Sequence, residues 1–189
     1  MPYVLSNKLL HAVLACACLG ALVAGGTASA EEANTTGGAA FIPPPPPPKK
    51  AKIRADGKVI APRSAPRRVK RVITAANRLI GKPYRYGGGH KAFSRKLDSG
   101  YDCSGSVSYA LYGGRFLRSP LPSGDLMGWG RADPGRWITV YANSGHAYIV
   151  VAGLRFDTGM RDDPDRTGPA WSKRLRKNDS YVPRHPRGY

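Results

Sequence analysis

The chain has 189 residues, of which 30 are Lys or Arg and 12 are Asp or Glu, so its formal charge at pH 7 is +18. This length is enough for one domain with a hydrophobic core, and it does not comfortably hold two. So basic a protein is expected to associate with polyanions, and charge alone does not choose between anionic polymers, anionic lipid and nucleic acid.

The first 30 residues have the pattern of an export signal. Lys8 precedes a mostly apolar run over residues 9–24, and Ala28-Ser29-Ala30 matches a small-x-small cleavage site. A lipoprotein site at Cys16 and an uncleaved membrane anchor are the alternatives, and the small, Gly-rich end of the run argues against the anchor. Cleavage would remove Lys8 and no acidic residue, which leaves a formal charge of +17.

Residues 31–67 are expected to form a disordered spacer. The six prolines from Pro43 to Pro48 favour an extended conformation, and the basic residues that follow repel one another. We interpret the segment as a tether between a folded domain and a surface, with a proline-rich ligand for a partner module as the alternative.

One folded domain is expected over residues 68–160. Apolar residues at helical spacing predict a first helix that ends before Gly81; these residues are Val69, Val72, Ile73, Ala76 and Ile80. After a Gly-rich loop, a second helix is predicted from Cys103 to the glycines at 113 and 114.

Three strands are predicted after a turn-rich stretch, over residues 137–142, 147–152 and 154–157, with a tight hairpin turn at Ala152-Gly153. Two helices followed by antiparallel strands predict an α+β domain. Residues 161–189 are interpreted as a basic tail broken by prolines, and its packing onto the domain is left open.

Cys103 is the only cysteine outside the leader. In an exported protein it has no intramolecular disulfide partner, which makes it a candidate nucleophile. The alternative is a buried structural cysteine. Its neighbours Asp102, Ser104 and Gly105 are small or polar residues, which are unusual beside a cysteine of the core, so a catalytic role is favoured.

A free thiol is mostly protonated at neutral pH, so a nucleophilic cysteine needs activation. A helix N-terminus at Cys103 would contribute only about 0.3–1 kcal/mol. His146, at the start of a predicted strand, is the best candidate base, and Asp157, at the end of the hairpin, is positioned to orient it. The alternatives are a strand-edge histidine without a role and a carboxylate that caps a turn.

Other chemistries are less well supported. His90 and His185 are expected to be solvated loop residues, and the histidines show no metal-ligand spacing, so no metal or cofactor is expected. The glycines at 87–89 are not followed by Gly-Lys-Ser/Thr, which argues for tight packing rather than phosphate binding. No nucleic-acid-binding motif accompanies the charge.

Three motifs together resemble the NlpC-type cell-wall cysteine peptidases: GKPYRYGG at 81–88, YDCSG at 101–105 and SGH at 144–146. The resemblance covers Val69 to Thr158. It implies a papain-like α+β fold, with N-terminal helices packed on an antiparallel sheet, that hydrolyses amide bonds in peptidoglycan stem peptides. Abundant Gly, Arg and Pro point to an actinobacterial member.

By this resemblance Cys103 is the nucleophile, His146 is the base, and Tyr84 lies near the oxyanion site with the backbone N–H of Cys103. Asp102 and Ser104 are further candidates for oxyanion or substrate contacts. Asp157 stands at the third catalytic position, where the family more often has His, Asn or Gln. The long stretch between residues 89 and 100 is a second departure from the family.

The sequence therefore predicts a secreted, wall-associated cysteine peptidase that acts as a monomer on peptidoglycan. Anionic wall polymers are candidate partners, whereas no specific nucleic acid and no membrane span after cleavage are expected. Two alternatives stay open: a catalytically inactive module that binds the wall or another polyanion, and acyl transfer on a different amide substrate.

Overall fold

The structure is a computed structural model that describes residues 46–94, 96–159 and 167–189. The described residues belong to a compact unit spanning Pro44–Tyr189. The predicted export signal, the first part of the predicted spacer and the start of the predicted tail lie outside these ranges. Within the described part of the chain, no helix is both long enough and apolar enough to cross a membrane.

Three helices and eight strands make up the described unit. In chain order they are β1 (Lys52–Ile53), β2 (Val59–Ile60), α1 (Arg67–Asn77), α2 (Cys103–Gly113), α3 (Ser123–Leu126), β3 (Arg131–Ala132), β4 (Ile138–Ala142), β5 (Ala147–Val151), β6 (Leu154–Gly159), β7 (Thr167–Ser172) and β8 (Val182–His185).

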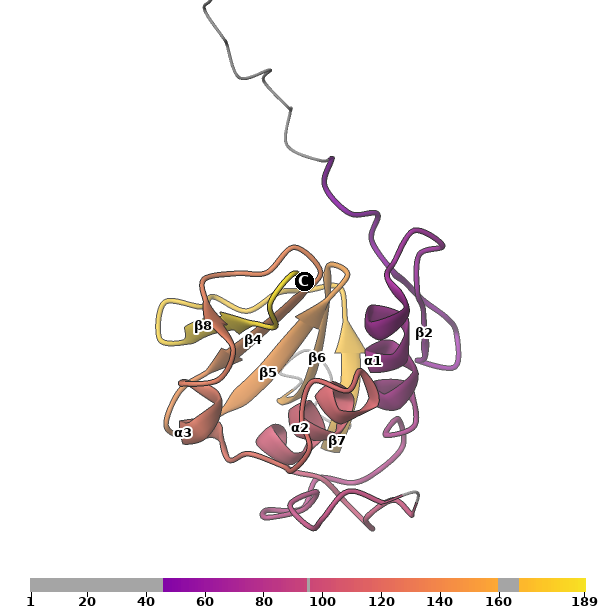
Figure 1. Ribbon diagram of the computed structural model, residues 1–189. Helices are drawn as coiled ribbons and strands as arrows, with labels where there is room; N and C mark the ends of the chain where they lie inside the picture. The colour runs from indigo at the N-terminus through magenta and orange to yellow at the C-terminus, as the bar shows by residue number, and fades with distance from the viewer. Residues whose placement is uncertain (1–45, 95, 160–166) are drawn as a thin grey trace, which may run out of the picture. The chain divides into compact units, whose positions relative to one another are not determined.

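Six strands form one antiparallel sheet in the order β3-β8-β4-β5-β6-β7, and β1 and β2 form a separate hairpin. Helices α1 and α2 pack against each other, and α2 lies against β5 and β6 (Figure 1). The predicted α+β fold, with N-terminal helices on an antiparallel sheet, is confirmed. The hydrophobic core lies between this helical layer and the sheet.

Both predicted helices are present. The predicted apolar positions Val69, Val72, Ile73 and Ala76 of α1 are buried. Helix α2 is buried along nearly its whole length, from Cys103 to Leu111. It can lie this close to α1 because residue 113 is glycine: a Cβ there would overlap the Cβ of Ala75.

The predicted hairpin between the second and third predicted strands is also present, as β5 and β6. Val151 pairs with Leu154, and the turn residues Ala152 and Gly153 both have positive φ, at 48° and 78°. Two positive φ values are what a tight two-residue hairpin turn requires, because they match the twist of the flanking strands. The turn sets the register that brings residues of β5 and β6 together at the open end of the hairpin.

The predicted disordered spacer is wrong for its second half. Residues 52–60 form the β1–β2 hairpin, and Ala51, Val59 and Ala65 are buried. The side chain of Asn77 in α1 holds this hairpin in place: its Oδ1 accepts from the Val59 N–H at 2.9 Å and its Nδ2 donates to the Val59 carbonyl at 2.8 Å. These contacts are long-range, so local composition does not reveal them.

The predicted tail is part of the sheet. Strand β7 pairs with β6, and β8 lies between β3 and β4. At the C-terminus, the carbonyl of Tyr189 accepts from the N–H of Trp137 and of Ile138. Neither strand shows clear alternation of apolar and polar residues, because Pro169 and Pro183 interrupt the pattern. The interval between β7 and β8, residues 173–181, lies beside the site described next.

Candidate active site

Cys103 is the first residue of α2, as predicted. The N-cap is Asp102, whose Oδ1 accepts from the backbone N–H of Gly105 at 2.7 Å. This cap defines where the helix starts, and the thiol therefore sits at the positive end of the helix dipole. Cys103 is buried, with 9% of its surface exposed.

The thiol is in contact with β5. Burial raises the pKa of the Cys103 thiol, but hydrogen bonds from His146 and from the backbone N–H of Ala147, with the charge of His146, outweigh burial and hold the pKa below its usual value. The charge of Asp102 opposes this effect. The site therefore stabilises the thiolate relative to a free cysteine.

His146 directly precedes β5 and is held by a tight turn. The side-chain Oδ1 of Asn143 accepts from the backbone N–H of His146 at 2.8 Å and from that of Gly145 at 3.0 Å. The imidazole Nε2 lies 2.9 Å from Oδ1 of Asp157. With Nε2 engaged in this way, Nδ1 is the ring nitrogen left for Cys103.

The environment of His146 favours its protonated form. Burial lowers the pKa of His146, yet its hydrogen bonds with Asp157 and Cys103 and the negative charges of both groups raise the pKa to about 9. The edge of the Tyr181 ring faces the imidazole, with centroids 6.3 Å apart, and Tyr148 lies at 6.5 Å. The raised pKa of His146 and the lowered pKa of Cys103 both favour transfer of the thiol proton to the imidazole, and the two groups titrate as a coupled pair.

Asp157 lies in β6 with none of its side chain exposed. The pairing of Ile149 with Phe156, continued by one step, places Asp157 opposite Tyr148 and diagonally across from His146. Burial raises the pKa of Asp157, but hydrogen bonds with His146, the Gly159 N–H and Arg176 outweigh burial and lower it. The structure thus brings together the three residues predicted as catalytic.

Tyr84 borders the same site. Its segment is fixed by bonds to the chain just before the nucleophile, with the Tyr101 N–H donating to the Pro83 carbonyl and the Arg85 N–H to the Tyr101 carbonyl. Burial, followed by the negative charges of Cys103, Asp102 and Tyr86, raises the pKa of Tyr84. The phenol therefore stays protonated at neutral pH and is available as a hydrogen-bond donor.

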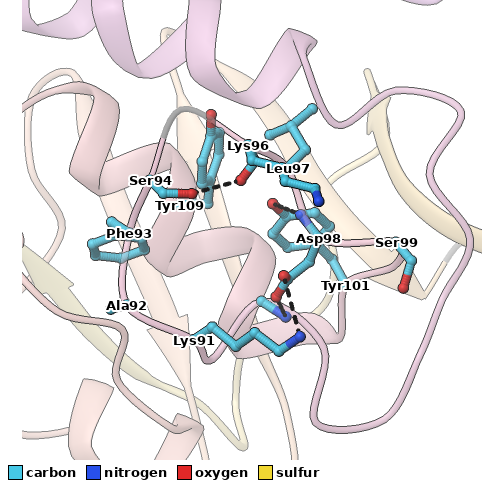
Figure 2. Close-up of a pocket in the computed structure, with 11 residues that line it drawn as sticks. Lys91, Ala92, Phe93, Ser94, Lys96, Leu97, Asp98, Ser99, Tyr101 and Tyr109 are labelled. Carbon is cyan, nitrogen blue, oxygen red and sulfur yellow. Dashed lines mark hydrogen bonds and ion pairs between the residues drawn. The ribbon is translucent and has the colours of Figure 1, made fainter.

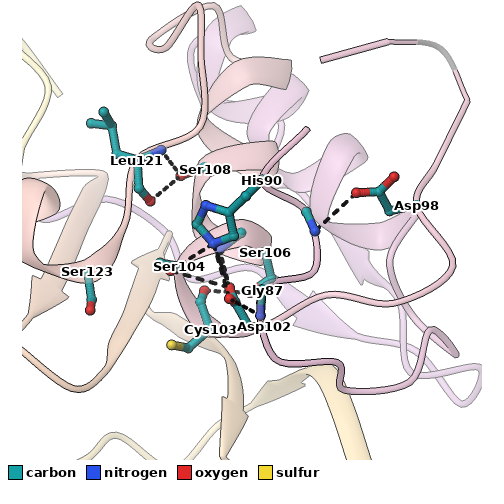
Figure 3. A network of polar contacts seen from close by, with 12 residues as sticks. Gly87, His90, Asp98, Asp102, Cys103, Ser104, Ser106, Ser108, Leu121 and Ser123 are labelled. Atoms are coloured by element: carbon teal, nitrogen blue, oxygen red, sulfur yellow. Dashed lines mark hydrogen bonds and ion pairs between the residues drawn. The ribbon is translucent and has the colours of Figure 1, made fainter. Parts of the chain in front are cut away.

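Asp102 and Ser104, predicted as oxyanion or substrate contacts, are engaged elsewhere. Nε2 of His90 lies 3.0 Å and 3.1 Å from the two oxygens of Asp102 and 3.2 Å from Oγ of Ser104. Asp102 also accepts from the backbone N–H of Gly87. Figure 3 shows this cluster, with the sulfur of Cys103 pointing away from it.

His90 was predicted to be a solvated loop residue, and that prediction is wrong. Its ring instead links the Gly-rich loop to the N-terminus of α2. His185, placed in the same class, lies in β8 and its Nδ1 is 2.8 Å from the carbonyl of Asp133. The tight loop packing predicted for the glycines is present, since a Cβ on Gly105 would overlap the Gly88 carbonyl oxygen.

The long stretch between residues 89 and 100 forms a pocket of its own. The pocket has a volume of about 380 Å³ and is closed on its inner side by Tyr101 and Tyr109 (Figure 2). Phe93 in this loop stacks on Tyr112 of α2, with ring centroids 4.3 Å apart. Cys103 and His146 do not line the pocket, so it is separate from the candidate active site.

Among the described residues, Arg155 and Arg176 contact Asp157, and sequence reasoning identified neither. Nε of Arg176 donates to Oδ2 at 2.6 Å, and Nε of Arg155 lies 3.4 Å from the same oxygen. The sequence gives a weak signal for Arg155, because it lies two positions before Asp157 and alternate residues of a strand share a face. Arg176 has none, since it lies 19 residues after Asp157 in an irregular segment.

No protein-family model and no curated protein matches the chain. Among solved structures, RipB, described as a peptidoglycan hydrolase of Mycobacterium tuberculosis, is 27% identical over 64% of this chain and 68% of its own, with a TM-score of 0.45. A hypothetical invasion protein of the same bacterium is 25% identical over 74% and 69%, with a TM-score of 0.46. Because both TM-scores are below 0.5, we base the functional assignment on the geometry of the site.

Proposed function

We propose that this protein is a cysteine hydrolase that cleaves amide bonds in the stem peptides of peptidoglycan. The observation that carries the proposal is the contact of the Cys103 thiol with the imidazole of His146, which the buried carboxylate of Asp157 orients. A structural cysteine has no need of such partners. A nucleophilic cysteine does, because only the thiolate attacks a carbonyl carbon.

The resting state is the thiolate–imidazolium pair. His146 has already taken the thiol proton, in keeping with its pKa of about 9 and the lowered pKa of Cys103. Asp157 accepts the Nε2–H hydrogen bond, which fixes the tautomer and turns Nδ1 toward the sulfur.

In the first half-reaction the Cys103 sulfur attacks the amide carbonyl carbon. The backbone N–H of Cys103 and the hydroxyl of Tyr84 are the donors for the oxyanion that develops. Donors of this kind are each worth about 10²–10³ in rate. His146 then donates its Nδ1 proton to the departing amine, and the thioester acyl-enzyme remains.

In the second half-reaction the now neutral His146 removes a proton from water, which attacks the thioester carbonyl. Collapse of that intermediate releases the carboxylic acid and restores the thiolate and imidazolium. Every proton is moved by His146, so no metal or cofactor takes part in this scheme.

The substrate class comes from the motif resemblance of residues 81–88, 101–105 and 144–146. Export of the protein by residues 1–30 and electrostatic attachment to anionic wall polymers belong to the same proposal.

The test is digestion of purified peptidoglycan, with released fragments and new amino groups measured by mass spectrometry. We expect cleavage by the wild-type protein and by a control, Lys177→Gln, which removes an exposed cation near the site. Cys103→Ala and Cys103→Ser should both lose cleavage while they keep the wild-type melting temperature.

Wall cleavage by Cys103→Ala at the wild-type rate would disprove the proposal. If neither the wild-type protein nor Cys103→Ala cleaves the wall, but both bind it in a salt-sensitive manner, the protein is the inactive binding module. Cleavage or acyl transfer on other amides, with no action on the wall, would keep the mechanism and replace the substrate.

A further inference from the structure

The two oxygens of Asp157 have separate partners. Oδ1 receives hydrogen bonds from Nε2 of His146 at 2.9 Å and from the Gly159 N–H at 3.0 Å. Oδ2 accepts a hydrogen bond from Nε of Arg176 at 2.6 Å, and Nε of Arg155 lies 3.4 Å from the same oxygen. One oxygen therefore orients the imidazole, and the other is paired with guanidinium groups.

Arg176 is held firmly in this position. Its Nη2 donates to the Gly159 carbonyl at 2.7 Å, and its guanidinium carbon lies 5.8 Å from the centre of the Tyr148 ring. The side chain is one-fifth exposed, so it enters the site from the surface segment between β7 and β8. These contacts aim it at Oδ2 and away from the oxygen that His146 uses.

The charges around His146 explain why such a partner matters. An imidazolium must give its proton to the departing amine, and a buried, uncompensated carboxylate beside it would hold that proton too tightly. A guanidinium on the far oxygen offsets part of the carboxylate charge and leaves the hydrogen bond to His146 intact. The ring stays oriented and keeps a useful acidity.

We propose that Arg176 is a positioning residue that compensates the charge of Asp157, so that the carboxylate orients His146 without trapping its proton. The inference rests on the proposed Cys–His chemistry. It adds a role for a residue of the segment between β7 and β8, which supplies no atom to the reaction itself.

Several other groups act on the same imidazole and are expected to stay constant in the test. Cys103 and Asp157 interact with it directly, and the phenols of Tyr148 and Tyr181 lie next to it. Arg155 remains beside Asp157 when Arg176 is changed, so compensation is reduced and not abolished.

The test is the titration of His146, followed by NMR of its ring signals and identified with His146→Ala. Arg176→Gln should raise the pKa of His146 by about 1 unit, since a cation has been removed from the far side of its carboxylate partner. Arg176→Lys keeps the charge and should retain most of the wild-type value. The matched control Lys177→Gln, at the next position, should not change it.

A double-mutant cycle separates compensation from support of the fold. Arg176→Gln should lower hydrolysis at pH 7 by about tenfold, because the imidazolium becomes a weaker acid. In an Asp157→Asn background the same change should cost less than about twofold, since no carboxylate charge remains to be offset. The alkaline limb of the pH–rate profile should move upward in Arg176→Gln and return when Asp157→Asn is added.

An unchanged His146 titration in Arg176→Gln would overturn the inference, as would equal activity losses in the two backgrounds. Should Arg176→Gln fail to fold, a His146 pKa in Arg176→Lys that departs from wild type by as much as 1 unit would overturn it as well. The NMR titration needs no turnover. If the pKa of His146 shifts as expected in Arg176→Gln but the wild-type protein never cleaves peptidoglycan, only the proposed function would be contradicted.

Discussion

The pairs His146–Asp157 and His90–Asp102 have nearly the same contact geometry, with Nε2 2.9 Å from the carboxylate in the first and 3.0 Å in the second. Their surroundings differ. His146 also bonds the thiol of Cys103, whereas His90 bonds Ser104 and ties a loop to the start of α2.

The two carboxylates differ in the same way. Asp157 is fully buried and divides its oxygens between an imidazole and guanidinium groups. Asp102 gives its oxygens to the backbone N–H groups of Gly87 and Gly105 as well as to His90. A histidine–carboxylate contact by itself therefore does not identify a catalytic site. The group that the second ring nitrogen faces and the other partners of the carboxylate distinguish the pair that we propose to be catalytic from the pair that links a loop to α2.

The largest effect is expected from replacing the histidine of the pair that we propose to be catalytic. His146→Ala should lower peptidoglycan hydrolysis by about 10²–10⁴-fold, since it removes the general acid and base. The midpoint for labelling of Cys103 by iodoacetamide should rise toward about 8.5, the value of a free thiol. Labelling rates measured from pH 4 to 10 check this, and a midpoint unchanged from wild type would mean that His146 does not activate Cys103.

A smaller effect is expected from Asp157→Asn, which keeps a hydrogen-bond acceptor and removes the charge. The pKa of His146 should fall from about 9, because the negative charge of Asp157 helps to raise it. The alkaline limb of the pH–rate profile should move to lower pH, and hydrolysis at pH 7 should fall by about 10–10²-fold. An alkaline limb that stays in place would show that Asp157 does not act on His146 electrostatically.

Asp102→Ala should reduce stability more than chemistry. Loss of the N-cap is expected to lower the free energy of unfolding by about 1–2 kcal/mol, which urea denaturation measures. The labelling midpoint of Cys103 should not rise, because the charge of Asp102 raises the pKa of the thiol and its removal acts in the opposite direction. A higher labelling midpoint in Asp102→Ala would mean that the His90–Asp102 pair contributes to the activation of Cys103.

The smallest effect is expected from His90→Ala. The side chain is partly exposed, and its hydrogen bond with Asp102 should be worth about 0.5–1.5 kcal/mol to stability. The pH profile of Cys103 labelling should match wild type. If His90→Ala instead reduced labelling as His146→Ala does, the distinction between the two pairs would be lost.

Sequence patterns identified the parts of the fold whose signals are local. Each of these signals lies within a short stretch of sequence. They are the spacing of apolar residues in α1, the glycines that flank α2 and the Ala152-Gly153 turn. Cys103 begins α2, and the turn joins β5, which His146 directly precedes, to β6, which contains Asp157. For this reason the three side chains could be paired before their positions were known.

The missed parts depend on contacts between distant residues. The hairpin of β1 and β2 is held by Asn77, whose Oδ1 also accepts from the indole N–H of Trp171 at 2.9 Å. Strand β7 pairs with β6, and β8 pairs with both β3 and β4, so both strands depend on partners in other segments of the chain. Their composition, rich in Pro and basic residues, favours a loop when it is read alone.

The sequence by itself determined the helix and strand pattern around the site, and it predicted Cys103 as the nucleophile and His146 as its partner, because each has a short-range signal in spacing or flanking residues. Only the tertiary structure decided that His90 holds Asp102 and Ser104, and that Arg176 reaches Asp157 from 19 residues away. Such contacts are set by how separate segments pack. Charge compensation of a buried carboxylate therefore becomes visible only once the sheet is assembled.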